Sequence, residues 1–458
     1  MRQLPRYMEI DISKYASDIP EDRLEAFYGL PQKVTFCTEC VMSNQRPSSC
    51  YEYEHTAESI KKTLNIQDDG VCDACHVNHE KTNHAIDWKI REEELRDLCD
   101  EFRKNDGTYD CLVPGSGGKD SFYAAHVLKY KYNMHPLTVT WAPNMYTEWG
   151  WQNFQAWIHA GFDNYLCTPN GKTHRLLTRL AVENLFHPFQ PFILGQKQLA
   201  PKIAAKFGIP LVFYGENEAE YGNPIGDNKS ALRDEEFFAV HDYDNIYLSG
   251  VSLRQLEEEF HLDRSDLAIY LPCETSDIEK NHIQVRYLGY YLKWHPQGAY
   301  YYSVEHGGFR PAAERTQGTY SKYNSIDDKI DDLHYYTTYI KYGLGRTSYD
   351  ASQEIRNDEI TLDEAKALCK KYDGEYPDRF EKEIMEYLSI DKMHFPEIYN
   401  CFEQPEMDRE YFMHLADRFR SPHIWKYEDG VWKLRHAAYE GDSEVLWGDP
   451  RGTHHDNI

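Results

Sequence analysis

The sequence lacks a long apolar run. No stretch approaches the roughly 18 residues of a membrane-spanning helix, and the mean hydropathy is −0.73. The first residues, MRQLPRYMEI, contain no hydrophobic stretch of the kind that signal peptides carry. We therefore expect a cytoplasmic protein without a membrane span.

Basic residues are also scarce relative to acidic ones. Lys and Arg together number 50, against 76 Asp and Glu, so the formal net charge is −26. A surface with this balance repels polyphosphate chains and anionic lipids. We expect neither a nucleic-acid partner nor binding to an anionic membrane.

A disulfide framework fits the cysteines poorly. The 458-residue chain has eleven, an odd number, and four of them form two C-x-x-C pairs. Paired thiols of this kind are more typical of a metal site in a reducing compartment.

Strand-like and helix-like segments alternate from about residue 109 onward. Strands are expected at 109–113, 137–141, 164–167 and 211–215, and helices at 88–102, 121–132, 151–159, 172–185 and 198–207. This alternation predicts an α/β fold with a parallel sheet. Two Tyr-rich stretches, 287–294 and 299–305, are expected to be strands, and 327–343 and 361–374 to be helices.

The sequence predicts that the chain has three parts. Residues 1–87 hold a cysteine module, 88–310 an α/β domain with a candidate insertion at 230–285, and 311–458 a mostly helical region with a polar tail. The stretch between the first and last paired cysteines is too poor in apolar residues to fold without a metal.

The strongest motif is SGGKDS, residues 116–121, placed between a strand and a helix. Glycines let the backbone turn sharply, and the helix start adds its positive dipole end, so such a turn can hold phosphate oxygens. The spacings of a Walker A loop and of a G-x-G-x-x-G dinucleotide loop are both absent.

This hexapeptide resembles the PP-loop of ATP pyrophosphatases, which have an adenine nucleotide alpha hydrolase-like fold. The resemblance implies ATP and Mg²⁺ as ligands, and it gives the β- and γ-phosphates to the loop. By analogy, adenine would lie near the end of the second strand. The residues implied are Ser116, Gly117, Gly118, Lys119, Asp120 and Ser121 for phosphates, and Thr140 and Trp141 for adenine.

The paired cysteines are Cys37 with Cys40 and Cys72 with Cys75. Two such turns offer four thiolates in a tetrahedron, which suits a structural Zn²⁺ with no open position for water. His76 and His79 are alternative ligands, and an iron–sulfur cluster is an alternative occupant.

Motifs over roughly residues 35–385 are similar to those of N-acetyl sugar amidotransferases. The matching stretches are VPGSGGKDS, GQK (195–197), FYGENEAEYG (213–222), ERTQGTYSKY (314–323) and GRTSYDASQEIR (345–356). Gly115, just before the loop, departs from the small β-branched residue expected there. The family serves surface polysaccharide (lipopolysaccharide) and nonulosonic acid synthesis, for example of pseudaminic and legionaminic acid.

The resemblance implies an ATP-dependent enzyme that converts an acetamido sugar into an acetamidino sugar through an O-adenylyl imidate. Lys119, Asp120, Lys197 and Glu216 are the candidate catalytic residues. Candidate substrate contacts are Asn217, Glu220, Tyr221, Arg315, Tyr320 and Arg346, with Arg356 as a further basic group for a carboxylate or phosphate.

None of the eleven cysteines has a neighbouring glycine, so the chain offers no glutaminase nucleophile on a sharp turn. We expect ammonia from a separate glutaminase, which the resemblance implies is of the imidazole-glycerol-phosphate-synthase type. Two alternatives are a tRNA thiolase that uses Cys111, Cys167 or Cys273, and a zinc-stapled interaction module that senses ATP.

Overall fold

A computed structural model describes residues 10–223, 229–241, 243 and 245–444. The last residues of the expected polar tail, 445–458, lie outside the described part. No helix in the described ranges is both long and apolar enough to cross a membrane.

A five-stranded parallel sheet forms the centre of the fold and confirms the α/β prediction. Its strands are β1 (Cys111–Pro114), β2 (Pro136–Trp141), β3 (Asn164–Cys167), β4 (Leu211–Tyr214) and β9 (Gln284–Tyr287). Their order is β3-β2-β1-β4-β9, and every neighbouring pair is parallel. The order reverses between β1 and β4, which is where open sheets of this kind place ligands, beyond the strands' C-terminal ends.

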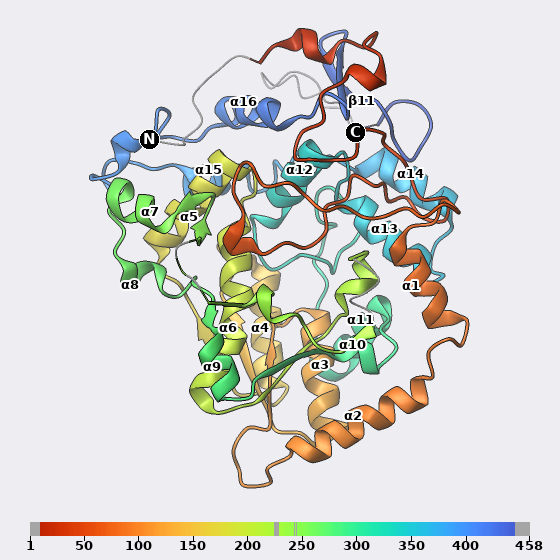
Figure 1. Ribbon diagram of the computed structural model, residues 1–458, viewed down its shortest axis with the longest axis vertical. Helices are drawn as coiled ribbons and strands as arrows, with labels where there is room; N and C mark the ends of the chain where they lie inside the picture. Colours follow the sequence, from red (N-terminus) through yellow and green to blue (C-terminus); the bar gives the residue numbers. More distant parts are fainter. Residues whose placement is uncertain (1–9, 224–228, 242, 244, 445–458) are drawn as a thin grey trace.

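Helices cover both faces of this sheet (Figure 1). Successive strand residues point to opposite faces, so Leu112 joins the core under α5 (Gly171–Leu185) and α6 (Gln190–Phe207). Its neighbours Cys111 and Val113 join the core under the helices of the other face. Those helices are α2 (Trp88–Phe102), α3 (Lys119–Tyr130) and α4 (Glu148–His159).

The connection from β4 to β9 is long and contains most of the candidate insertion, whose last two residues, 284 and 285, instead begin β9 of the central sheet. It holds η4 (Glu218–Tyr221), η6 (Glu235–Phe237), β5 (Ala239–Val240), β6 (Tyr247–Leu248), β7 (Val251–Ser252), α7 (Leu253–Phe260), α8 (Arg264–Leu267), β8 (Cys273–Glu274) and α9 (Thr275–Lys280). Residues near Leu232 pair antiparallel with β9 and cover that edge of the sheet.

The two Tyr-rich stretches are mostly helical, so their prediction as strands was wrong. They form α10 (Leu288–Tyr291) and α11 (Pro296–Gly307). The ring of His295 accepts the backbone N–H of Gly298 over 3.0 Å, and Pro296 occupies the first helical position. These start signals outweigh the strand propensity of tyrosine.

The C-terminal region is mostly helical, as predicted. It comprises α12 (Asp331–Tyr342), α13 (Arg346–Arg356), α14 (Leu362–Tyr372), α15 (Glu381–Leu388), η7 (Tyr399–Cys401), α16 (Arg409–Phe419) and the hairpin β10 (Trp425–Glu428) and β11 (Val431–Leu434). The predicted capping box of Thr361 and Glu364 begins α14. Ile390 and Phe395 pack in the same core as the sheet residue Val212, so this region is fastened to the sheet.

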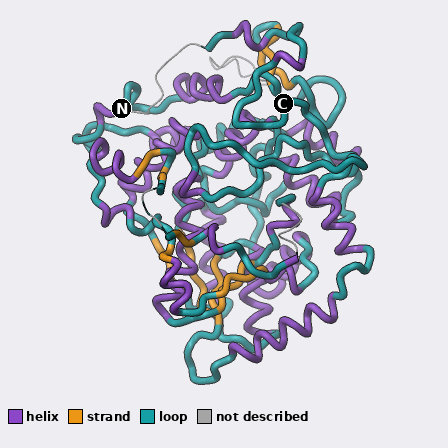
Figure 2. Tube along the Cα trace, in the orientation of Figure 1, coloured by secondary structure: helices purple, strands orange, loops and turns teal. Residues whose placement is uncertain are grey.

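The N-terminal segment before α1 (Asp73–Thr82) is mainly loop, with the short turns η1 (Ile12–Tyr15), η2 (Glu21–Arg23) and η3 (Glu52–Glu54) (Figure 2). It packs against the other end of the chain. The Tyr15 hydroxyl donates to the carbonyl of Arg420 over 2.9 Å, and the Tyr15 ring meets Trp432 edge-on.

Candidate active site

The SGGKDS segment connects the end of β1 to the start of α3, at the point where the strand order reverses. Gly117 has a φ of +88°, and a Cβ there would lie 2.7 Å from the carbonyl oxygen of Asn153. Gly118, in contrast, has an ordinary φ of −64°, and a Cβ there would make only an ordinary contact with the Ser116 hydroxyl, at 3.8 Å. The loop therefore has the sharp turn that a phosphate site needs.

Two carboxylates and one lysine meet beside this loop. The Lys119 ammonium contacts the Asp120 carboxylate over 2.5 Å, and the second oxygen of Asp120 is buried without a hydrogen-bond partner among the described residues. Burial and the nearby Asp120 charge raise the pKa of Glu216 to about 7. Glu216 follows β4, so the two carboxylates come from the neighbouring strands at the switch point.

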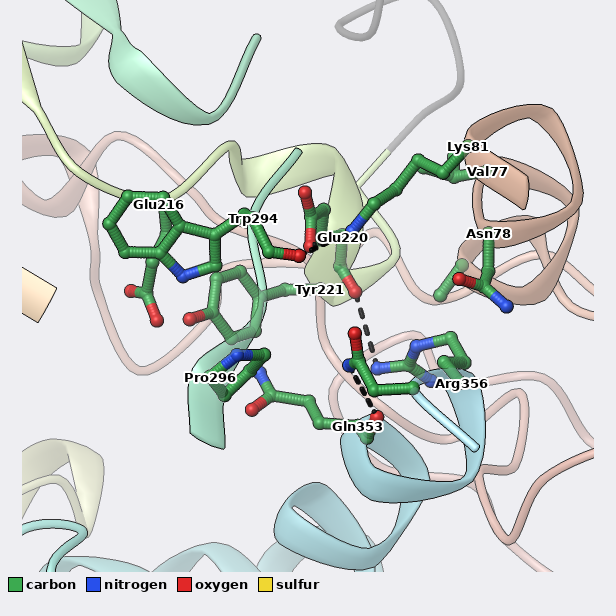
Figure 3. Close-up of a pocket in the computed structure, with 12 residues that line it drawn as sticks. Val77, Asn78, Lys81, Glu216, Glu220, Tyr221, Trp294, Pro296, Gln353 and Arg356 are labelled. Atoms are coloured by element: carbon green, nitrogen blue, oxygen red, sulfur yellow. Dashed lines mark hydrogen bonds and ion pairs between the residues drawn. The ribbon is translucent and has the colours of Figure 1, made fainter. Parts of the chain in front are cut away.

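The loop after β4 holds four of the predicted residues, of which Figure 3 shows Glu216, Glu220 and Tyr221. Figure 3 shows the Tyr221 hydroxyl next to the Glu216 carboxylate, and burial together with the Glu216 charge raises the pKa of Tyr221 well above its usual value. The Asn217 side chain accepts the N–H of Ala219 at the start of η4. Glu220 is bound to Lys81 of α1 over 2.7 Å, so its carboxylate is already paired.

Lys81 is a contact that the sequence analysis missed. Its ammonium is buried and also donates to the carbonyl of Trp294 over 3.1 Å. Arg356, on α13, donates to the carbonyl of Glu220 over 3.2 Å. Three segments that are distant in sequence thus fix the loop after β4.

The remaining predicted basic and aromatic contacts are engaged within the C-terminal region. Arg315 forms a bidentate pair with Glu375 at 2.6 and 2.7 Å, and the Tyr320 hydroxyl donates to Glu354. Arg346 pairs with Asp350 over 3.0 Å. Their role as sugar contacts stays a prediction.

Lys197 and Thr140 make their hydrogen bonds outside the SGGKDS segment. The Lys197 ammonium donates to the carbonyl of Cys50 over 3.3 Å. Thr140 is fully buried in β2 and accepts a hydrogen bond from Asn164. Roles of these side chains toward ATP stay predictions.

A cavity of about 260 Å³ opens next to Ser116 and Trp141. The sequence analysis missed one of its walls, which the 327–335 segment provides. The stretch around Asp327 was interpreted only as the start of a helix, because nothing local in the sequence shows that it faces the loop 200 residues earlier.

The four paired cysteines are brought together and buried, each sulfur within 4.8 Å of the others. The Cys37–Cys75 and Cys40–Cys72 sulfur distances are 4.0 and 3.8 Å. Tetrahedral Zn–S bonds of about 2.3 Å place sulfurs at about this separation. The donor set and spacing therefore fit zinc.

The alternative ligands His76 and His79 point elsewhere. His76 contacts Asp69 over 3.2 Å, and His79 contacts Glu39 over 2.8 Å. The cluster is complete without them.

A second group of metal-ligand types, Cys50, Glu52 and His55, also lies together. Here the Lys61 ammonium lies 2.7 Å from Nε2 of His55 and 3.8 Å from the Cys50 sulfur. The Lys61 ammonium therefore already lies next to these atoms, and we interpret the group as a buried polar network.

The cysteines considered for a thiolase do not have the character of nucleophiles. Burial raises the pKa of Cys111 well above its usual value, and burial likewise raises the pKa of Cys167 and of Cys273. A thiol in this state is a poor thiolate source.

Comparison with known proteins connects the C-terminal region to surface glycans. The model of the C-terminal domain of WbpG-like LPS biosynthesis proteins matches residues 317–438. An uncharacterized protein of Methanocaldococcus jannaschii is 29% identical over 85 residues, which cover 19% of this chain and 29% of that protein. The match thus spans less than a third of that relative. A WbpG-like C-terminal domain fits a role in surface polysaccharide biosynthesis.

Proposed function

We propose that the protein is an ATP-dependent amidotransferase that converts the acetamido group of a sugar into an acetamidino group for a bacterial surface glycan. The observation that carries this proposal is the SGGKDS turn at the switch point, with Asp120 and Glu216 beside it. The WbpG-like region supports the glycan pathway. The reaction itself rests on the motif resemblance.

The chemistry requires activation because an amide oxygen is a poor leaving group. The acetamido oxygen attacks the α-phosphorus of ATP, an O–P bond forms, and the bond to the β-phosphate breaks to release pyrophosphate. Ammonia then adds to the imidate carbon, AMP departs with the former amide oxygen, and the nitrogen loses a proton. The protein's contribution is to position the reactants and stabilise charge.

Each part of the site has a role in this scheme. Backbone N–H groups of the loop and the start of α3 would hold the β- and γ-phosphates, with Lys119 adding positive charge. Glu216, with its raised pKa, would accept the proton from the incoming nitrogen.

The carboxylates also fit Mg²⁺. One buried oxygen of Asp120 has no hydrogen-bond partner among the described residues, and the Asp120 carboxylate lies close enough to Glu216 for their charges to interact. Hard carboxylate oxygens are the ligands that Mg²⁺ prefers. When bound there with ATP, Mg²⁺ would neutralise phosphate charge. The cysteine cluster would hold Zn²⁺ in a structural role, since four thiolates leave no open position.

Ammonia would come from a separate glutaminase, because the chain has no cysteine next to a glycine. Direct transfer between the two proteins would keep ammonia from being lost as ammonium at neutral pH.

Purified protein incubated with ATP, Mg²⁺, ammonium chloride and candidate acetamido sugars tests the proposal. The expected products are AMP, pyrophosphate and a sugar whose mass differs by the exchange of O for NH. ADP as the nucleotide product, or AMP formation that no acetamido sugar stimulates, would contradict it.

A further inference from the structure

Two arginines beside the cysteine cluster are buried without a carboxylate partner. Arg46 and Arg356 are 7% and 8% exposed, and neither forms an ion pair with an acidic side chain in the part of the chain that the structure describes. Nε and Nη1 of Arg46 and Nη1 of Arg356 also lack a hydrogen-bond partner there. Because a buried charge is costly unless it is paired, these guanidinium groups need a nearby anion.

Arg356 lies beside the turn that carries the second cysteine pair. Together with Ala74 it lines the small cavity of Figure 3, and Ala74 stands in the chain between Cys72 and Cys75. Arg356 lies close enough to these two cysteines and to Cys40 for their charges to interact. The cluster is therefore within reach as a source of negative charge.

Arg46 lies at the same turn. A Cβ on Gly222 would be 3.7 Å from Nη1 of Arg46 and 3.4 Å from the Cβ of Ala74. Arg46 also lies close enough to Cys72 and to Arg356 for their charges to interact. Burial lowers the pKa of Arg46, but a guanidinium group stays protonated in proteins. Two like charges thus lie near each other in the interior.

A carboxylate or phosphate of a substrate, which the sequence analysis predicted for Arg356, is too large to be the missing anion at this place. The cavity beside Arg356 measures about 10 Å³, which is room for about one water molecule. The Glu220 carboxylate interacts with the Arg356 charge, but it is already paired with Lys81 over 2.7 Å. Neither a bound substrate nor this glutamate therefore balances the two arginines.

The four paired cysteines can supply the balance when they hold a divalent metal. Cysteines bind a metal as thiolates, so four of them around a doubly charged ion form a centre with a net charge of minus two. The two arginines carry the opposite charge. The buried centre and its arginines are then neutral as a whole, whereas four protonated thiols would leave two buried cations without a counter-charge.

We infer that Arg46 and Arg356 are the counter-charges of a divalent metal centre formed by the four paired cysteines. The inference rests on the zinc site of the proposed function and assigns the residues around it. It also makes Arg356 a positioning residue, because the same side chain holds the carbonyl of Glu220. The charge of the metal centre thereby fixes a side chain on which the loop after β4 depends.

The affinity of the full chain for Zn²⁺, measured by competition with a chelator of known affinity, tests this assignment. Arg46→Gln and Arg356→Gln each remove one positive charge, and each should bind zinc about tenfold more weakly than the wild type, as is typical when a partner of the ligands is lost. Arg46→Lys and Arg356→Lys keep the charge and should retain most of the affinity. A merely structural role of the long side chains would not separate glutamine from lysine in this way.

Arg254→Gln is the matched control, because the Arg254 side chain is 82% exposed on α7, and it should bind zinc as the wild type does. Thermal unfolding of the zinc-loaded variants checks that they are folded. Unchanged zinc affinity in both glutamine variants, or equally weak binding by the glutamine and lysine variants, would overturn the assignment while leaving the zinc site standing. Absence of zinc binding by the wild type would overturn both.

Discussion

Arg356 donates a hydrogen bond to the backbone carbonyl of Glu220 over 3.2 Å. Its neighbour Ile355 packs against the apolar core that surrounds the four paired cysteines. Helix α13 therefore contacts both the cysteine cluster and the loop after β4, and it connects the proposed zinc module to the candidate active site.

Zinc should be bound by the cysteine cluster. We expect about one zinc per chain by elemental analysis, and Cys72→Ser should lose it because a structural site needs all four ligands. Cys167→Ser changes a half-buried cysteine outside the cluster and should keep the metal. Unchanged zinc content in Cys72→Ser would mean that the site is elsewhere.

The Lys81–Glu220 pair should stabilise the junction between α1 and the loop after β4. Lys81→Met leaves the Glu220 carboxylate without its partner and should lower the free energy of unfolding by about 3–5 kcal/mol, measured in urea. Adding Glu220→Gln should recover part of the loss. Lys89→Met, on the exposed side of α2, serves as the control; an equal effect there would refute a specific role of the pair.

Alanine substitutions at the two glycines of the SGGKDS segment should affect folding stability and ATP binding differently. Gly117→Ala places a methyl group against the backbone of Asn153 at a positive φ and should cost about 1–3 kcal/mol of stability. Gly118→Ala adds only an ordinary contact with the Ser116 hydroxyl, at 3.8 Å, so its unfolding midpoint should stay within error of the wild type. Its affinity for ATP should nevertheless fall about tenfold, because the added methyl group would take space that the proposed phosphate site needs. Wild-type ATP binding by Gly118→Ala would argue against this phosphate site.

Glu216 should make stability fall as pH rises. Its pKa is raised to about 7 from an ordinary 4.5, so the folded state holds the proton more tightly than the unfolded chain. The contribution is complete below pH 4.5 and is lost as pH rises through 7. Glu216→Gln should therefore be more stable than the wild type at pH 8, by about 1–3 kcal/mol, and equal to it at pH 4.

Glu218→Gln is the matched control for that pH series. Burial opposes the charge of Glu218, but Arg233 at 2.7 Å outweighs it and lowers the pKa of the carboxyl. This variant should lose stability at pH 8. A change of stability in the same direction for both variants at pH 8 would contradict a raised pKa of Glu216.

Nitrogen supply gives a further test. The isolated chain with ATP and its acetamido sugar should form product with ammonium chloride at high pH, where more of the nitrogen is free ammonia. Glutamine alone should give none. Glutamine-dependent turnover by the purified chain would reveal a glutaminase site that the cysteine pattern does not show.

Local signals account for what could be predicted from the sequence. The strand, glycine turn and helix around residues 111–130 are adjacent in the chain, and paired C-x-x-C turns report a metal cluster by spacing alone. The acidic cavity wall could not be predicted, because Asp327 and Ser116 line the same cavity only after the chain returns from some 200 residues away. The helices at 288–307 were missed because their tyrosines favour strands in isolation, whereas the cap at His295 acts through geometry.

The packing of the first residues against the last ones sets an order of events during synthesis. Tyr15 can contact Arg420 and Trp432 only after these residues have left the ribosome. Leu344 packs against the cysteine cluster, so that contact also forms late in synthesis. Until those residues emerge, the segment around Tyr15 lacks these contacts, and an unpacked segment is exposed to proteases and to misassembly. Early capture of a metal ion by the cysteines would hold that segment together until the end of the chain arrives.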